Sequence, residues 1–128
     1  MRFTIETGSG HHLAVDAAND IGGQNSASSP MEMLLAGLAG CAGISVLSIL
    51  YKSKQQITSY KVRVQSKRAE AHPKVFTQIT VEHIFTGHAI NPALVKRAID
   101  LSEERYCGVS VMLGETADLT HTFHIIEA

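Results

Sequence analysis

The chain has 128 residues, a length that fits a single domain with a sizeable core. Its 11 basic and 12 acidic residues nearly balance, which excludes the charge pattern of a nucleic-acid-binding or membrane-surface protein. With two cysteines and no apolar leader at the start, the sequence argues against a secreted disulfide scaffold. It predicts reduced thiols in the cytoplasm.

The first part of the chain predicts a β-hairpin followed by a loop. Residues 2–7 and 11–16 both alternate apolar and polar side chains, and a short linker with two glycines separates them. Residues 17–28 are rich in Asn, Gly and Ser, which predicts a loop long enough to have a function.

The segment from Ser29 to Lys54 predicts the central helix. Ser29 as N-cap, Pro30 at the first helical position and Glu32 three residues after the serine form a capping box. Met33–Leu50 then runs for 18 residues without a charge. Glycines at three positions in this run indicate close helix packing, because glycine is unfavourable inside a helix.

An uncharged run of this length also meets the requirement for a transmembrane helix. The other predicted elements, however, are amphipathic and need an apolar element to pack on. We therefore interpret the run as a core helix and expect no membrane partner. About five short strands and one helix cannot cover such a helix on every side, so we expect a homodimer that shares it.

The second half predicts a further hairpin, a helix and a last strand. Ser59–Arg68 and Val75–Phe85 alternate as strands, and the first of them has one wet face. Asn91 and a following proline open a second helix by the same capping device. We expect this helix to end near Cys107, with Gly108 as its C′ residue.

A short helical turn over Val109–Leu113 and a strand over Leu119–Ile126 complete the predicted chain. The order of strands and helices, ββ–α–ββ–α–β, predicts an α+β fold in one domain over residues 1–128. Its expected architecture is a curved antiparallel sheet packed on two helices.

The two cysteines occupy different predicted environments. Cys41 lies within the apolar helix and Cys107 at the end of the second helix. Both can be inert fillers, since free cysteine is among the most buried residue types. A reactive thiolate needs a helix N-terminus or a cation, but Cys41 lies roughly 18 Å beyond the helix start. A reactive Cys41 therefore needs a donor from elsewhere.

Four stretches of sequence resemble the OsmC/Ohr family, and the likeness is to its uncharacterised branch. The first signature is similar to SSPMEM at 28–33 followed by LAGC at 38–41, and the second to EERYCGVSVML at 103–113. SGHHLAVD at 9–16 and THTF at 120–123 extend the likeness over almost the whole chain.

The resemblance implies an intertwined homodimer with a buried central helix and both cysteines at the subunit interface. It also implies reduction of small organic hydroperoxides, an antioxidant stress-response activity. Cys41 would be the peroxidatic thiolate, and Cys107 would resolve its sulfenic acid as a disulfide. A dithiol reductant such as a lipoylated protein would restore the thiols, and no metal or organic cofactor is implied.

The sequence departs from the family pattern in the groups that activate the thiolate. Active members use a glutamate directly after the helix proline, whereas here Met31 takes that place and Glu32 follows it as a capping residue. They also use an arginine from an N-terminal loop, and this chain has no Arg or Lys between Thr4 and Lys52. His11 and His12 fall in that region and are the candidate substitutes.

These departures leave alternatives open. The chain can be a non-catalytic relative that binds an apolar small molecule or senses oxidation at the dimer interface, or its cysteines can be purely structural. The histidines form no recognisable metal motif. His83 and His88 are expected around a strand end, and His121 and His124 on opposite faces of the last strand.

Overall fold

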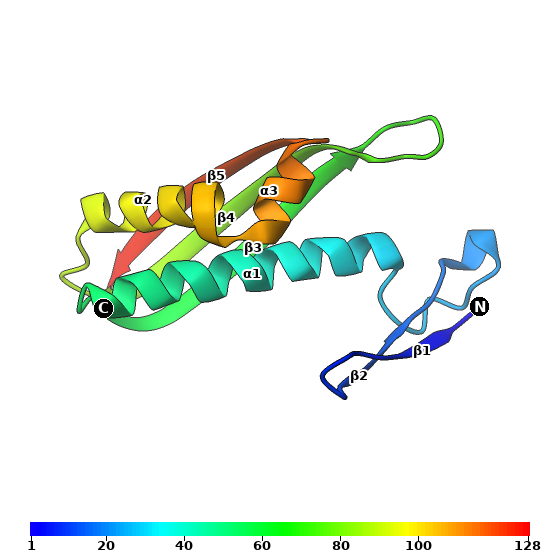
Figure 1. Cartoon of the computed structure of the whole chain (residues 1–128), viewed down its shortest axis with the longest axis horizontal. Coiled ribbons are helices and arrows are strands. Elements are labelled where there is room, and N and C mark those ends of the chain that lie inside the picture. The colour runs from blue at the N-terminus through cyan, green and yellow to red at the C-terminus, as the bar shows by residue number, and fades with distance from the viewer. The chain divides into compact units, whose positions relative to one another are not determined.

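The computed structural model describes all residues from 1 to 128 (Figure 1). The chain forms two compact units, Met1–Gly37 and Leu38–Ala128.

The first unit contains the predicted hairpin and the loop that follows it. Strands β1 (Phe3–Glu6) and β2 (His12–Val15) pair in antiparallel fashion, and η1 (Asn19–Ile21) is a single 3₁₀ turn inside the loop. Asp16 fixes the loop: its buried carboxylate accepts the Ser26 hydroxyl at 2.6 Å and backbone N–H groups of three loop residues. Because these donors stabilise the charged form, the pKa of Asp16 is strongly lowered, mainly by Ser26.

The capping box at the start of α1 (Pro30–Lys52) is confirmed. The Glu32 N–H donates to Ser29 Oγ at 3.2 Å, and the Ser29 N–H donates to Glu32 Oε1 at 2.9 Å. These two bonds satisfy donors that a helix start otherwise leaves free. The bonds from Ser29, the backbone bond first, lower the pKa of Glu32.

Within the second unit, α1 buries one narrow stripe and leaves the rest of its apolar surface open. The buried residues recur every fourth position, as one face of a helix requires: Leu38, Ala42, Val46 and Leu50. Ile44 and Tyr51 are 75% and 60% exposed. α1 is long and apolar enough to cross a membrane, but the core helix of a globular protein can have the same length and composition. Of the most apolar stretch of α1, 22% is buried within the chain.

The main sheet has three strands, ordered β3 (Gln56–Arg68), β4 (Phe76–His88) and β5 (Asp118–Glu127). β3 and β4 form the predicted antiparallel hairpin, but β5 lies parallel to β4. The expectation of a wholly antiparallel sheet is therefore wrong. Two helices and a π turn connect β4 to β5, a crossover long enough to return the chain to the same end of the sheet (Figure 1).

Both long helices pack on the same face of this sheet. The core joins residues of α1, β4 and α2 (Pro92–Leu101), with partly buried side chains of β3 and β5 around it: Val46, Leu50, Phe85, Ile90, Val95, Ala98 and Ile99. The α2 start is capped as predicted, with the Ala93 N–H donating to Asn91 Oδ1 at 2.9 Å. The opposite sheet face is polar, which confirms the alternation predicted for β3.

The end of α2 differs from the prediction. The helix continues into the π turn η2 (Ser102–Tyr106), whose Cys107 N–H donates to the Ser102 carbonyl at 2.8 Å. Cys107 is extended, and Gly108 starts α3 (Gly108–Gly114) instead of acting as a C′ residue. Gly108 does not have the positive φ that a C′ glycine adopts. The α+β class is confirmed, with three helices and two sheets.

Candidate functional site

Cys41 and Cys107, 66 positions apart in sequence, are neighbours in the folded second unit. Cys41 lies on α1 and is half-buried, whereas Cys107 joins η2 to α3 and is fully buried. Both are free thiols. The structure therefore brings together the two residues that the sequence singled out for redox chemistry.

The Cys107 sulfur caps α3. Its Sγ accepts the backbone N–H of Ser110 at 3.4 Å. Burial raises the pKa of the Cys107 thiol, and the neighbouring Cys41 thiol raises it further, while Ser110 acts in the opposite direction. The net shift is upward, so Cys107 holds its proton in the resting protein.

A pair of serines joins the two thiol-bearing segments. Ser45 lies one turn after Cys41 on α1, and its hydroxyl shares a short hydrogen bond with that of Ser102 at the start of η2. The Ser102 carbonyl in turn accepts the Cys107 N–H. Two hydrogen bonds thus connect the Cys41 helix to the Cys107 backbone. Below, the thiol cluster means Cys41, Ser45, Ser102, Cys107 and Ser110.

The other sequence candidates lie in the first unit and are engaged there. Glu32 is held by its capping box. His11 Nδ1 hydrogen-bonds to Ser9 Oγ at 2.9 Å, and His12 Nε2 to Glu6 Oε1 at 3.1 Å, all on the exposed hairpin. Arg2, the one arginine of this unit, donates to the Ser26 carbonyl at 2.9 Å.

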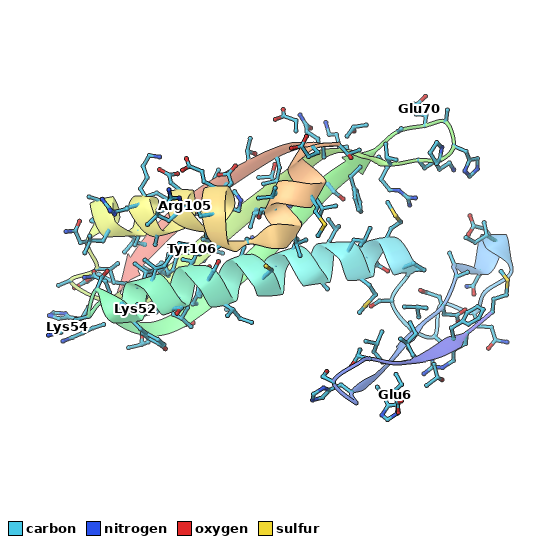
Figure 2. All side chains as sticks on the ribbon, viewed as in Figure 1. Glu6, Lys52, Lys54, Glu70, Arg105 and Tyr106 are labelled. Atoms are coloured by element: carbon cyan, nitrogen blue, oxygen red, sulfur yellow. The ribbon has the colours of Figure 1, made fainter.

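The arginine nearest in sequence to either thiol is solvated. Arg105 and Tyr106 both lie on η2 just before Cys107 and are exposed (Figure 2). No ion pair holds Arg105 toward the sulfur. The local donors to Cys107 are therefore uncharged groups.

A second buried polar group, the imidazole chain Tyr60–His83–His121, was not predicted from the sequence. The Tyr60 hydroxyl is 2.6 Å from His83 Nδ1, and His83 Nε2 is 2.9 Å from His121 Nδ1. The three residues come from β3, β4 and β5, so the chain crosses the whole sheet beneath the helices. His83 is mid-strand and fully buried, not at a strand end as expected.

Proton counting assigns the direction of these bonds. If Tyr60 donates to His83 and His83 donates to His121, the only polar side-chain atom of these three residues without a partner is Nε2 of His121. The reverse direction also leaves the tyrosine proton without an acceptor. The first assignment keeps both imidazoles neutral.

Burial favours the neutral forms as well. It lowers the pKa of His83 to about 4, with a smaller contribution from His121, and it raises the pKa of Tyr60 well above its usual value. The pKa of His121 is lowered by burial, and Asp100 partly opposes that shift.

A surface cavity of about 250 Å³ adjoins the His121 end of the imidazole chain. It is lined by Lys96, Ile99, Asp100, Glu103, His121, Thr122 and Phe123.

The sequence contains a weak indication of the imidazole chain. Tyr60 and His121 fall on the apolar faces of their predicted strands, where a polar group needs a partner. Identifying that partner requires the pairing register of three strands, because Tyr60 and His121 lie 61 positions apart in the sequence. No group of three or more His, Cys, Asp or Glu side chains is arranged to hold a metal ion.

The comparisons with known proteins agree with this fold. Residues 23–122 match the family model described as OsmC-like protein. Protein YhfA of Escherichia coli K12 is 38% identical over 128 residues, covering 100% of this chain and 92% of that protein. The chain therefore belongs to the OsmC-like family.

Two solved structures illustrate the range of relatives. A structural-genomics structure is 37% identical, with a TM-score of 0.89 over 99% of this chain and 92% of that chain. The organic hydroperoxide resistance protein OhrB of Bacillus subtilis is 16% identical, with a TM-score of 0.63 over 97% and 96% of the two chains. The second likeness concerns the fold alone.

Proposed function

We propose that this protein reduces organic hydroperoxides with Cys41 and Cys107 as its only redox groups. The observation that carries the proposal is the pairing of two neighbouring free thiols with unequal exposure. The half-buried Cys41 is open to a substrate, while the fully buried Cys107 is open only to its neighbour. That arrangement suits one thiol for peroxide attack and the other for resolution.

The reaction consists of two balanced steps. The Cys41 thiolate attacks the O–O bond, so the sulfur becomes a sulfenic acid and the alkoxide leaves as an alcohol after taking a proton. The Cys107 sulfur then attacks the Cys41 sulfur, forming the S–S bond and breaking the S–O bond. The hydroxide leaves as water with the Cys107 proton, and a dithiol reductant returns both cysteines to thiols.

The proposal includes a homodimer in the cytoplasm. Apolar side chains of α1 and α3, among them Ile44 and Met112 (68% exposed), have no cover within the chain. A second copy presenting the same helices supplies one. Ile44→Glu is expected to convert the dimer to monomer in light-scattering measurements, and a wild-type monomer at micromolar concentration contradicts this part of the proposal.

The first test is the intact mass of the reduced protein before and after one equivalent of cumene hydroperoxide, with peroxide followed in parallel. The expected result is rapid peroxide loss with loss of two hydrogens, mapped to a Cys41–Cys107 disulfide and absent in Cys41→Ser. Unchanged peroxide and mass reject the peroxidase.

The alternative function is a sensor of oxidation. It is favoured by the raised pKa of Cys107, because a resolving thiol that keeps its proton attacks slowly. A sensor forms the same disulfide slowly, so with excess dithiothreitol it consumes peroxide no faster than dithiothreitol alone does. Protein-dependent turnover well above that background rate excludes it.

A further inference from the structure

The buried hydroxyl of Ser110 has an unusual position in the thiol cluster. Ser110 is 3% exposed, and its Oγ has no hydrogen-bond partner in the protein. A buried hydroxyl without a partner is costly, so its retention needs a reason. The side chain belongs to the residue whose backbone N–H already donates to Cys107 Sγ.

The local backbone explains why this hydroxyl is free. Ser110 stands three residues after the N-cap Cys107, the position from which a side chain usually accepts the N-cap N–H in a capping box. Here that N–H is unavailable, because it donates to the Ser102 carbonyl across the π turn at 2.8 Å. The hydroxyl is left beside the sulfur, with its proton free to donate.

We propose that Ser110 activates the resolving cysteine by donating its hydroxyl proton in a hydrogen bond to the Cys107 thiolate as that thiolate forms. Resting Cys107 is a buried thiol and offers only a weak acceptor. Once it loses its proton, the sulfur becomes a strong acceptor beside one residue with two donors: the Ser110 N–H, which already lies 3.4 Å from Sγ, and the Ser110 hydroxyl, whose side chain acts on this thiol. No cation is required at this sulfur, in keeping with the exposed position of Arg105.

The inference rests on the proposed function and assigns the group that promotes its second step. The Ser110 hydroxyl gains a partner only when Cys107 is charged, so it stabilises the attacking form selectively. Formation of the Cys41 sulfenic acid, which precedes this step, does not depend on it. Burial raises the pKa of Cys107, and the Ser110 side chain acts against that rise, as a donor that favours the thiolate must.

The experiment separates the two steps in Ser110→Ala, Ser110→Thr and wild-type protein. Reduced protein is mixed with one equivalent of cumene hydroperoxide, quenched with dimedone at set times and weighed intact. In Ser110→Ala we expect an unchanged rate of peroxide loss and disulfide formation slowed at least about tenfold, with trapped sulfenic acid accumulating. Ser110→Thr retains the hydroxyl and is expected to restore the disulfide rate.

Ser53→Ala is the matched control, because it removes a serine hydroxyl that bonds only to the Ile49 carbonyl at the far end of α1. A disulfide rate in Ser110→Ala equal to that of this control overturns the proposal. A hydroxyl with a merely structural role also leaves the pH profile of the disulfide step unchanged, whereas the proposal moves that profile to higher pH.

A second measurement avoids peroxide, so failure of the peroxidase cannot be confused with failure of this inference. In the Cys41→Ser background, the pH midpoint of the ultraviolet absorbance of the thiolate reports the ionisation of Cys107, the one remaining cysteine, and needs no reagent to reach the buried sulfur. Ser110→Ala is expected to shift that midpoint to higher pH and Ser110→Thr to leave it in place. An unmoved midpoint in folded Ser110→Ala contradicts the proposal.

Discussion

The second unit contains two buried polar groups that differ in what they can change. The imidazole chain is built on three strands, and its bonds are made with all members neutral. The thiol cluster is built on helix ends and a π turn, and it contains an unused donor beside a sulfur. Comparable burial thus serves two purposes: the first group fixes strand packing, and the second retains the freedom to change charge and bonding.

The largest expected effect tests the chemistry of the thiol cluster. Cys107→Ser is expected to abolish repeated turnover with dithiothreitol at limiting concentration while leaving the first turnover intact, because Cys41 still reacts with peroxide. Its sulfenic acid should persist and be trapped by dimedone. An undiminished steady-state rate would mean that external thiol resolves Cys41 directly.

The imidazole chain, by contrast, is expected to act on stability. His83 has a pKa of about 4 in the folded protein against 6.5 as its ordinary value, so the unfolded chain binds more protons between these values. Stability is complete above pH 6.5 and falls as pH drops toward 4, by at most about 3 kcal/mol. Urea denaturation across this range measures it.

The control for that titration is His72→Gln, which removes an exposed histidine in the β3–β4 turn. It should keep the wild-type pH dependence, whereas His83→Gln should flatten it. If both variants keep the same slope between pH 4 and 6.5, the buried chain does not account for the acid sensitivity.

A smaller effect is expected where the thiol cluster is held together. Ser102→Ala removes the hydroxyl bond to Ser45, which still donates to the Ala42 carbonyl at 3.2 Å. We expect a loss of about 1 kcal/mol of stability. The Cys41–Cys107 disulfide should also become easier to reduce in a glutathione redox buffer, since the thiols are less well positioned. If the redox equilibrium of Ser102→Ala equals that of the Ser53→Ala control, the Ser45–Ser102 pair does not position the two thiols.

The smallest effect concerns the first unit. Glu32→Ala should lower the melting temperature slightly, because the Ser29 N–H loses its acceptor, and it should leave peroxide reduction unchanged. A large loss of activity without a matching loss of stability would give Glu32 a role at the site beyond capping.

Local patterns predicted most elements of the fold. The Ser29–Glu32 and Asn91–Pro92 caps, both hairpins and the wet face of β3 follow from neighbouring residues alone. The parallel placement of β5 was not predictable in this way, because it depends on how the intervening helices cross the sheet. Gly108 was misassigned because a glycine beside a helix end acts as a C′ residue only when its own φ is positive, which composition does not reveal.

The candidate site was likewise predicted only in part. Resemblance to a family predicted the meeting of Cys41 and Cys107, which no spacing rule provides. Ser45, Ser102 and Ser110 were missed because a serine in a helix has no distinctive pattern until its partner is known. Tyr60, His83 and His121 needed the strand register, in which His83 faces Phe123 and His121 faces Val81.

The width of the π turn determines where Cys107 lies relative to Cys41. Because η2 closes its last turn over five residues instead of four, it contains one residue more than an α-helix would need. Wound as an α-helix, the same residues from Ser102 to Cys107 would carry the sulfur about 100° further around the axis. The wider turn thus sets the direction in which Cys107 faces, and a change that restored α-helical winding without removing a residue would uncouple the two cysteines while both sulfurs are retained.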